Sequence, residues 1–130
     1  MKAWWYGPDI LPHGDGRHVV VGETLAIEGE LMLCHNGLHW SESALGALHY
    51  GSGRFWRVEP GGKILHGDDK GCSSERTHLA VVKDTDEVLR RFSRLCALDV
   101  TGAWDHEDKA VVMRWLRTGD ESLRQAAHSA

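Results

Sequence analysis

Glycine and proline interrupt the first half of this chain so often that no long helix fits between them. They recur every few residues from Gly7-Pro8 to Gly71. Both residue types disfavour the interior of helices and strands, so the elements between them must be short. The intervening runs are rich in β-branched and aromatic residues, which predicts short strands joined by tight turns. The predicted strands are 18–21, 25–27, 31–34, 55–58, 63–65 and 77–82.

Two helices are predicted, one inserted between the strands 31–34 and 55–58 and one after the last strand. Ser41 is a good N-cap residue for a short helix that continues to Tyr50. A second helix over 85–97 begins with a capping-box spacing at Asp84. Its arginines lie on one face, and its apolar residues on the other are expected to pack on the strands. These apolar residues are Val88, Leu89, Phe92, Leu95 and Cys96.

A third helix is predicted over 106–117, with Asp105 as its N-cap and Gly119 as its stop. The tail from 120 to 130 is helix-prone but has little to bury. Strands followed by helices are typical of the α+β class with a mainly antiparallel sheet.

The length of 130 residues fits one domain. We expect a strand-rich body over 1–83 and a helical part over 84–130. The apolar start Trp4-Trp5-Tyr6 is predicted to form an edge strand packed on the core. The alternative is a partner-binding patch.

Charge and cysteine content restrict the function. The net charge of −4 argues against direct nucleic-acid binding, which needs a basic stripe. No apolar run is long enough to span a bilayer, and we expect a soluble, cytoplasmic protein with no membrane partner. Cys34, Cys72 and Cys96 are an odd number, which suits a reducing compartment. They are interpreted as small buried thiols.

Metal binding and thiol catalysis have little support from the spacing. His35 and His39 have the spacing of one zinc-ligand pair, but the cysteines and histidines together match no common zinc pattern, and no metal is expected. Cys34 and His35 are neighbours that point to opposite faces if they lie on a strand, so a structural thiol is favoured over a nucleophile. Further ligands would have to come from His66, Cys72 or His78.

Acidic residues cluster at a predicted turn and at two predicted helix starts. One interpretation is that the helix-start carboxylates complement helix dipoles. The other is that the clusters form a surface that competes with nucleic acid for a basic partner. The clusters are Asp68-Asp69, Asp84 with Asp86 and Glu87, and Asp105 with Glu107 and Asp108.

Several segments resemble a family of small phage and prophage proteins whose function is not established. The resemblance extends over most of the chain and implies a phage-type accessory protein without implying a reaction. The segments that carry it are Leu33–Tyr50, Gly67–Lys70, Ser74–Thr77, Arg94–Val100 and Thr118–Arg124.

A second, local resemblance concerns Gly37–Glu42 with Ala47 and Tyr50. This segment is similar to ADP-ribosyltransferases of the poly-ADP-ribose polymerase type, and it implies that fold more than that activity. In that family a helix supplies a tyrosine that stacks on nicotinamide. The resemblance assigns NAD binding to Trp40, Ser41 and Tyr50.

The resemblance is incomplete in two places. Tyr6-Gly7 stands where the family has a His-Gly pair, so the histidine is missing. Glu75 would be the catalytic glutamate, but its neighbours do not define that role.

The leading hypothesis is a non-catalytic accessory protein, without a cofactor, that acts in the cytoplasm of a bacterial host. It would bind and inhibit a host protein complex, in the manner of an anti-CRISPR protein acting on a nucleic-acid-handling defence complex. The alternative is an NAD-dependent ADP-ribosyltransferase that modifies a host protein, and a phage structural or assembly component stays open. The acidic surface of the leading hypothesis consists of Asp68, Asp69, Asp105, Glu107 and Asp108.

Overall fold

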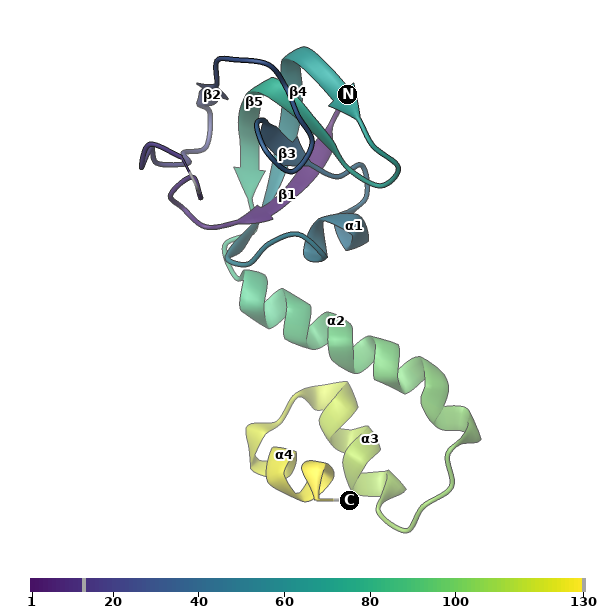
Figure 1. Cartoon of the computed structure of the whole chain (residues 1–130). Helices are drawn as coiled ribbons and strands as arrows, with labels where there is room; N and C mark the ends of the chain where they lie inside the picture. The colour runs from purple at the N-terminus through teal and green to yellow at the C-terminus, as the bar shows by residue number, and fades with distance from the viewer. Residues whose placement is uncertain (13, 130) are drawn as a thin grey trace. The chain divides into compact units, whose positions relative to one another are not determined.

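A computed structural model describes residues 1–12 and 14–129 and divides the chain into two compact units (Figure 1). The first unit is Met1–Thr85 and the second is Asp86–Ala130. This division lies within a few residues of the predicted change from strands to helices at 83/84. That the two units form a single domain stays a prediction.

The first unit is built on an antiparallel five-stranded sheet. Its order is β1-β4-β5-β2, and β3 also pairs with β5. With the helices that follow, the sheet confirms the predicted α+β class and the predicted strand at Trp4-Trp5-Tyr6. The strands are β1 (Ala3–Gly7), β2 (Thr24–Ala26), β3 (Leu38–Trp40), β4 (Arg54–His66) and β5 (Gly71–Val81).

The long β4–β5 hairpin is the frame on which the other strands assemble (Figure 1). One side of β5 pairs with β4, and the other side pairs first with β3 and then with β2. Trp4 and Ser41 exchange two backbone hydrogen bonds of 2.8 Å, which join β1 to the chain just after β3. The strands therefore curl around one interior.

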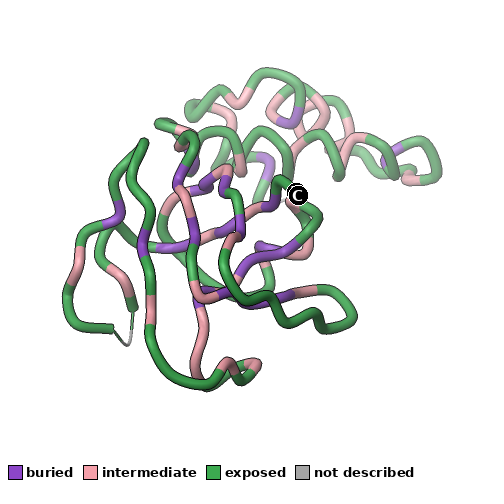
Figure 2. Tube along the Cα trace, turned by 90° about the horizontal axis from the view of Figure 1, so that it is seen from above, coloured by how far each residue is buried: buried purple, intermediate pink, exposed green. Residues whose placement is uncertain are grey.

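The core of this unit is aromatic and includes two buried basic side chains. Figure 2 shows short buried stretches separated by exposed ones along the strands. Arg76 and His78 are buried on β5 beside this core, and both pack against the ring of Trp5. The core residues are Ala3, Trp5, Val19, Leu25, Leu38, Trp40, Trp56 and Val58.

Two predicted strands are wrong. Residues 18–21 form only an isolated bridge, between His18 and Ile10, although Val19 is buried. Residues 31–34 form a turn in which the Asn36 N–H donates to the Met32 carbonyl at 2.8 Å. Apolar side chains there suggested strands, but local backbone hydrogen bonds replace ladder bonds.

Other predicted boundaries also differ from those in the structure. The predicted strands 55–58 and 63–65 are parts of one strand, β4, because an irregularity between Gly61 and Ile64 accommodates the Pro60-Gly61-Gly62 break. Strand β3 was missed. The short helix α1 (Ala44–Leu48) begins later than predicted, and its N-cap is Ser43, whose Oγ accepts from the Gly46 N–H at 3.0 Å. Ser41 instead has its backbone bonded to β1.

The second unit is helical. The predicted stop at Gly119 is confirmed, since this residue has a φ of 66° and its N–H donates to the Trp115 carbonyl. The predicted N-cap Asp105 is wrong, because Asp108 occupies that position. The helix-prone tail forms a helix capped by Asp120. The elements are α2 (Thr85–Val100), the 3-10 turn η1 (Thr101–Ala103), α3 (Lys109–Thr118) and α4 (Glu121–His128).

The apolar stripe of α2 is largely exposed. Val88, Phe92 and Leu95 are exposed, and their packing on the strands stays a prediction. The periodicity correctly predicted a helix, but a helical period does not specify what covers the apolar face. Among the described residues, no helix combines the length and the apolar character that a membrane crossing requires.

Candidate functional site

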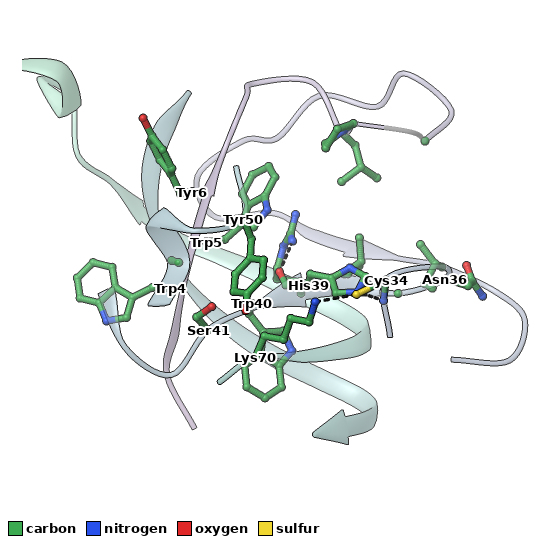
Figure 3. Close-up of a pocket in the computed structure, with 18 of the residues that line it drawn as sticks. Trp4, Trp5, Tyr6, Cys34, Asn36, His39, Trp40, Ser41, Tyr50 and Lys70 are labelled. Carbon is green, nitrogen blue, oxygen red and sulfur yellow. Dashed lines mark hydrogen bonds between the residues drawn. The ribbon is translucent and has the colours of Figure 1, made fainter. Parts of the chain in front are cut away.

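A pocket of about 590 Å³ opens in the first unit (Figure 3). Its walls come from β1, β3, α1, the turn before β3, Lys70 just before β5 and Arg76 in the middle of β5, together with residues near Leu11 and Ile27. Aromatic rings dominate these walls, and a few polar groups lie among them, which is the composition of small-molecule sites. The aromatic lining residues are Trp4, Trp5, Tyr6, Trp40 and Tyr50, with His35 and His39.

Arg76 is the most deeply buried charged group on the pocket wall. It is 1% exposed, and its guanidinium carbon lies 3.9 Å from the ring centroid of Trp5. Its Nε donates to Nε2 of His78 at 3.0 Å, and its Nη1 donates to the carbonyl of His39 at 2.7 Å. The guanidinium is therefore held rigidly from two directions.

No carboxylate neutralises this arginine from the pocket wall. None of the described residues lining the pocket is Asp or Glu. Burial lowers the pKa of Arg76 to about 9, so the side chain is still charged at neutral pH. Burial, followed by the charge of Arg76, lowers the pKa of His78 to about 4. His78 is therefore neutral and can accept the hydrogen bond from Arg76.

Two buried donors on the pocket wall have no acceptor among the described residues. They are Nη2 of Arg76 and Nε1 of Trp40. A buried donor without an acceptor costs about 1–3 kcal/mol, and more when the donor is charged. Both residues line the same pocket, but the two nitrogen atoms themselves expose almost no surface, so an acceptor oxygen of a ligand would reach them only after neighbouring side chains move.

A second polar cluster lies at the pocket around Cys34 (Figure 3). Nζ of Lys70 donates to Sγ of Cys34 at 2.7 Å and lies 4.5 Å from the Tyr50 ring centroid. The Tyr50 hydroxyl donates to Asp69 at 2.5 Å. The Cys34 backbone N–H donates to Nε2 of His39 at 2.9 Å.

These contacts shift the pKa values of the groups around the thiol. The hydrogen bond to Cys34 raises the pKa of Lys70, so its ammonium stays protonated. Burial, with the charge of Lys70 next, lowers the pKa of His39, which suits its role as an acceptor. The hydrogen bond to Asp69 raises the pKa of Tyr50.

The residues assigned by the ADP-ribosyltransferase resemblance are only partly brought together. Trp40, Ser41 and Tyr50 all line the pocket, with Trp40 and Ser41 buried and Tyr50 exposed. Glu75 is exposed and precedes the buried Arg76 on β5, so the two side chains leave opposite faces of the sheet. The structure does not bring Glu75 to the pocket.

The predicted acidic surface is divided between the two units. Asp68 and Asp69 are exposed in the β4–β5 turn. Asp105 and Glu107 are exposed in the helical unit, and Asp108 is half-buried there. Each cluster is accessible within its own unit.

The interpretation of all three cysteines as buried is wrong. Only Cys72 is buried, whereas Cys34 and Cys96 are exposed. Residues 31–34 lie in a turn rather than a strand, and Cys34 has a φ of 67°. The histidine bonded to Cys34 is His39 rather than the adjacent His35, and it accepts from the Cys34 backbone N–H, whereas the partner of the sulfur is Lys70. No group of metal-binding side chains suited to an ion occurs within residues 1–12 and 14–129.

No local sequence pattern identifies Arg76 as a pocket residue. The predicted strand began at Thr77, which left Arg76 in a loop, where an arginine is ordinarily solvated. Lys70 was likewise noticed only as part of the Gly67–Lys70 segment. A longer β5 would have placed Arg76 and His78 on the same face.

The fold and site define a small antiparallel α+β unit with an aromatic, cationic pocket. Residues 15–91 match the family described as a domain of unknown function (DUF7666), which is more than half of the chain. The chain belongs to this family. The matched range includes Cys34, Lys70 and Arg76 but not the lining residues of β1. No curated protein and no solved structure matches the chain, ADP-ribosyltransferases included.

Proposed function

We propose that the first unit is a binding module for a small aromatic molecule that carries an acid group. The single observation that carries this proposal is the buried Arg76 guanidinium, whose Nη2 has no acceptor among the described residues. A carboxylate oxygen placed there would accept from a charged donor, which is among the stronger hydrogen bonds in proteins. The aromatic walls favour a planar ring next to the acid group.

The size and charge of the pocket support a small ligand. Its volume of about 590 Å³ lies inside the range of typical small-molecule sites. Lys70 adds a second positive charge near the wall formed by Tyr50. The indole N–H of Trp40 is a second donor without an acceptor among the described residues, and it would be available to a ligand after a movement of the wall.

The hypotheses drawn from the resemblances stay predictions. A phage or prophage origin and inhibition of a host defence complex are each independent of the Arg76 pocket. The NAD hypothesis shares the aromatic wall with our proposal, but it needs a glutamate that the β5 register turns away from this wall.

Binding can be measured with benzoate as the probe and benzamide as its neutral match. We expect benzoate to shift the indole N–H signal of Trp40 in a proton–nitrogen correlation spectrum, with Trp40→Phe used to assign that signal. Benzamide should bind at least about tenfold more weakly, because a hydrogen bond to a charged group contributes about 1.5–3 kcal/mol. Equal binding of the two probes would refute an acid-selective site.

Arg76→Gln tests the proposed anchor, and Arg57→Gln is its matched control. Arg57 is half-buried and stacks over the ring of Trp4, but it does not line the pocket. We expect Arg76→Gln to abolish the preference for benzoate and Arg57→Gln to retain it. If Arg76→Gln does not fold, the comparison of benzoate with benzamide on the unchanged protein still decides the question.

A further inference from the structure

We propose that Cys34 is a modification site that forms a mixed disulfide with small anionic disulfides. The thiol is exposed, it lies on the wall of the pocket, and its sulfur accepts a hydrogen bond from the Lys70 ammonium at 2.7 Å. Figure 3 shows the Lys70 amine pointing at this sulfur. A cation beside a thiol favours the thiolate, which is the form that attacks disulfides.

The backbone at Cys34 is strained. Its φ of 67° makes it the sole non-glycine residue with a positive φ in the described part of the chain. This conformation costs an L-amino acid free energy and persists only where the surroundings impose it. The hydrogen bond from the Cys34 N–H to His39 helps to hold it. The strained turn places the sulfur beside Lys70, and strain of this kind is concentrated at functional sites.

A second, independent group in the same pocket indicates which reagent would reach the thiol. Arg76 is almost completely buried, lines the pocket and keeps one donor nitrogen without an acceptor among the described residues. Lys70 and Arg76 are the lysine and the arginine of the pocket lining, whereas the Asp69 carboxylate, which interacts with Lys70 and accepts from Tyr50, does not line the pocket. The preference for an anionic disulfide therefore rests on the proposed function, whereas the reactivity of the thiol with Lys70 beside it does not.

The exchange balances without any further oxidant. The Cys34 thiol releases its proton to solvent, and the resulting thiolate attacks one sulfur of the incoming disulfide. The disulfide bond of the reagent breaks as the new sulfur–sulfur bond to Cys34 forms. The other half of the reagent leaves as a thiolate, so Cys34 is oxidised and the leaving half is reduced. Lys70 keeps its proton throughout and stabilises the anionic sulfur.

Cys96 supplies a matched control within the chain, because it is an exposed thiol on α2. Cys96→Ser leaves Cys34 as the only exposed cysteine, and Cys34→Gly leaves Cys96. Glycine is chosen at position 34 because it accepts a positive φ. The rates are measured on the full chain with neutral dithiodipyridine and with anionic dithionitrobenzoate, and mass spectrometry identifies the modified cysteine.

We expect Cys34 to react with the neutral reagent at least about tenfold faster than Cys96, because of the adjacent ammonium. Lys70→Gln should remove most of this advantage. Lys63→Gln, which changes an exposed lysine on β4 that does not line the pocket, should leave it intact. Equal rates at Cys34 and Cys96, or an unchanged rate in Lys70→Gln, would overturn the assignment of Cys34.

The second reagent separates this proposal from the proposed function. If the anionic reagent reacts faster than the neutral reagent at Cys34 but not at Cys96, the result would support both the thiol site and the proposed acid-binding pocket. A fast reaction with the neutral reagent and no anionic gain would support the thiol site and count against the anion pocket. A loss of benzoate binding after Cys34 is modified would show that the two groups share one pocket.

Discussion

At the scale of single residues, two basic side chains on β5 explain most of the chemistry of the first unit. Arg76 and His78 point inward at alternate positions and stack on the aromatic core around Trp5. Burial acts on them in the same direction, since it disfavours the charged form of each. Arg76 keeps its charge at neutral pH because its ordinary pKa is so high, and His78 loses its charge.

The lowered pKa of His78 predicts acid sensitivity. Its folded value of about 4 lies below the ordinary value of 6.5, so the unfolded chain binds a proton that the folded protein does not. The stability conferred by the neutral form is complete above pH 6.5 and decreases as the pH falls toward 4. We expect about 2 kcal/mol less free energy of unfolding at pH 4.5 than at pH 7 from this residue.

Urea unfolding followed by tryptophan fluorescence at these two pH values measures the effect. His78→Gln should lose clearly less stability on acidification than the unchanged protein, whatever its stability at pH 7. His66→Gln is the control for the loss of a histidine side chain, because His66 is exposed on β4. An identical pH dependence in His78→Gln would contradict the buried neutral histidine.

At the scale of elements, the sequence predicted whether a segment is a helix or a strand better than it predicted where the element begins and ends. Helix α2 and the stop of α3 follow from local periodicity and from Gly119, and both are confirmed. Strand β3 and the full length of β5 depend on pairing between distant segments, which no local pattern contains. The pocket residues were hard to predict for the same reason. Arg76 gains its significance from neighbours on β1 and β3.

The end of α3 gives a prediction with an internal control. Gly119 has a φ of 66°, whereas Gly102 in η1 has no positive φ and no atom close to the position of an added Cβ. Gly119→Ala should destabilise the helical unit by about 1–2 kcal/mol, because an L-residue is strained there and its Cβ would lie 2.6 Å from Cζ of Arg94, which would have to move. Gly102→Ala should have no effect or should stabilise by up to about 1 kcal/mol. Thermal melts followed by circular dichroism at the helical band test both, and equal changes would disprove the cap.

At the scale of the whole molecule, the inhibitor hypothesis depends on acidic groups in both units. We expect binding to a basic partner to weaken with salt, since exposed charges act over about 8 Å at physiological ionic strength. Asp68→Asn is preferable to a change at Asp69, which bonds to Tyr50. In a pull-down from host lysate, the Asp68→Asn variant is compared with a variant in which Asp105, Glu107 and Asp108 are changed to the corresponding amides. Full binding by both at low and high salt would end this hypothesis.

The division into two units predicts that they differ in their ability to fold independently. All eight core residues of the main cluster lie within the first unit. Its last residue, Thr85, accepts from the Phe55 N–H at 3.1 Å and donates to the Val82 carbonyl at 2.7 Å. A fragment of residues 1–88 keeps these bonds. We expect it to retain the tryptophan fluorescence and the dispersed amide spectrum of the full chain.

The fragment 86–130 should behave differently. Its buried apolar residues are Leu116 and Ala127, and α3 and α4 are only 10 and 8 residues long. Isolated helices of this length are marginal in water, because nucleation costs more than a few hydrogen bonds return. Circular dichroism should show a clear loss of helix relative to the full chain and no cooperative melt. A cooperative transition in 86–130, or a collapsed spectrum for 1–88, would place the stabilising core elsewhere than in the first unit.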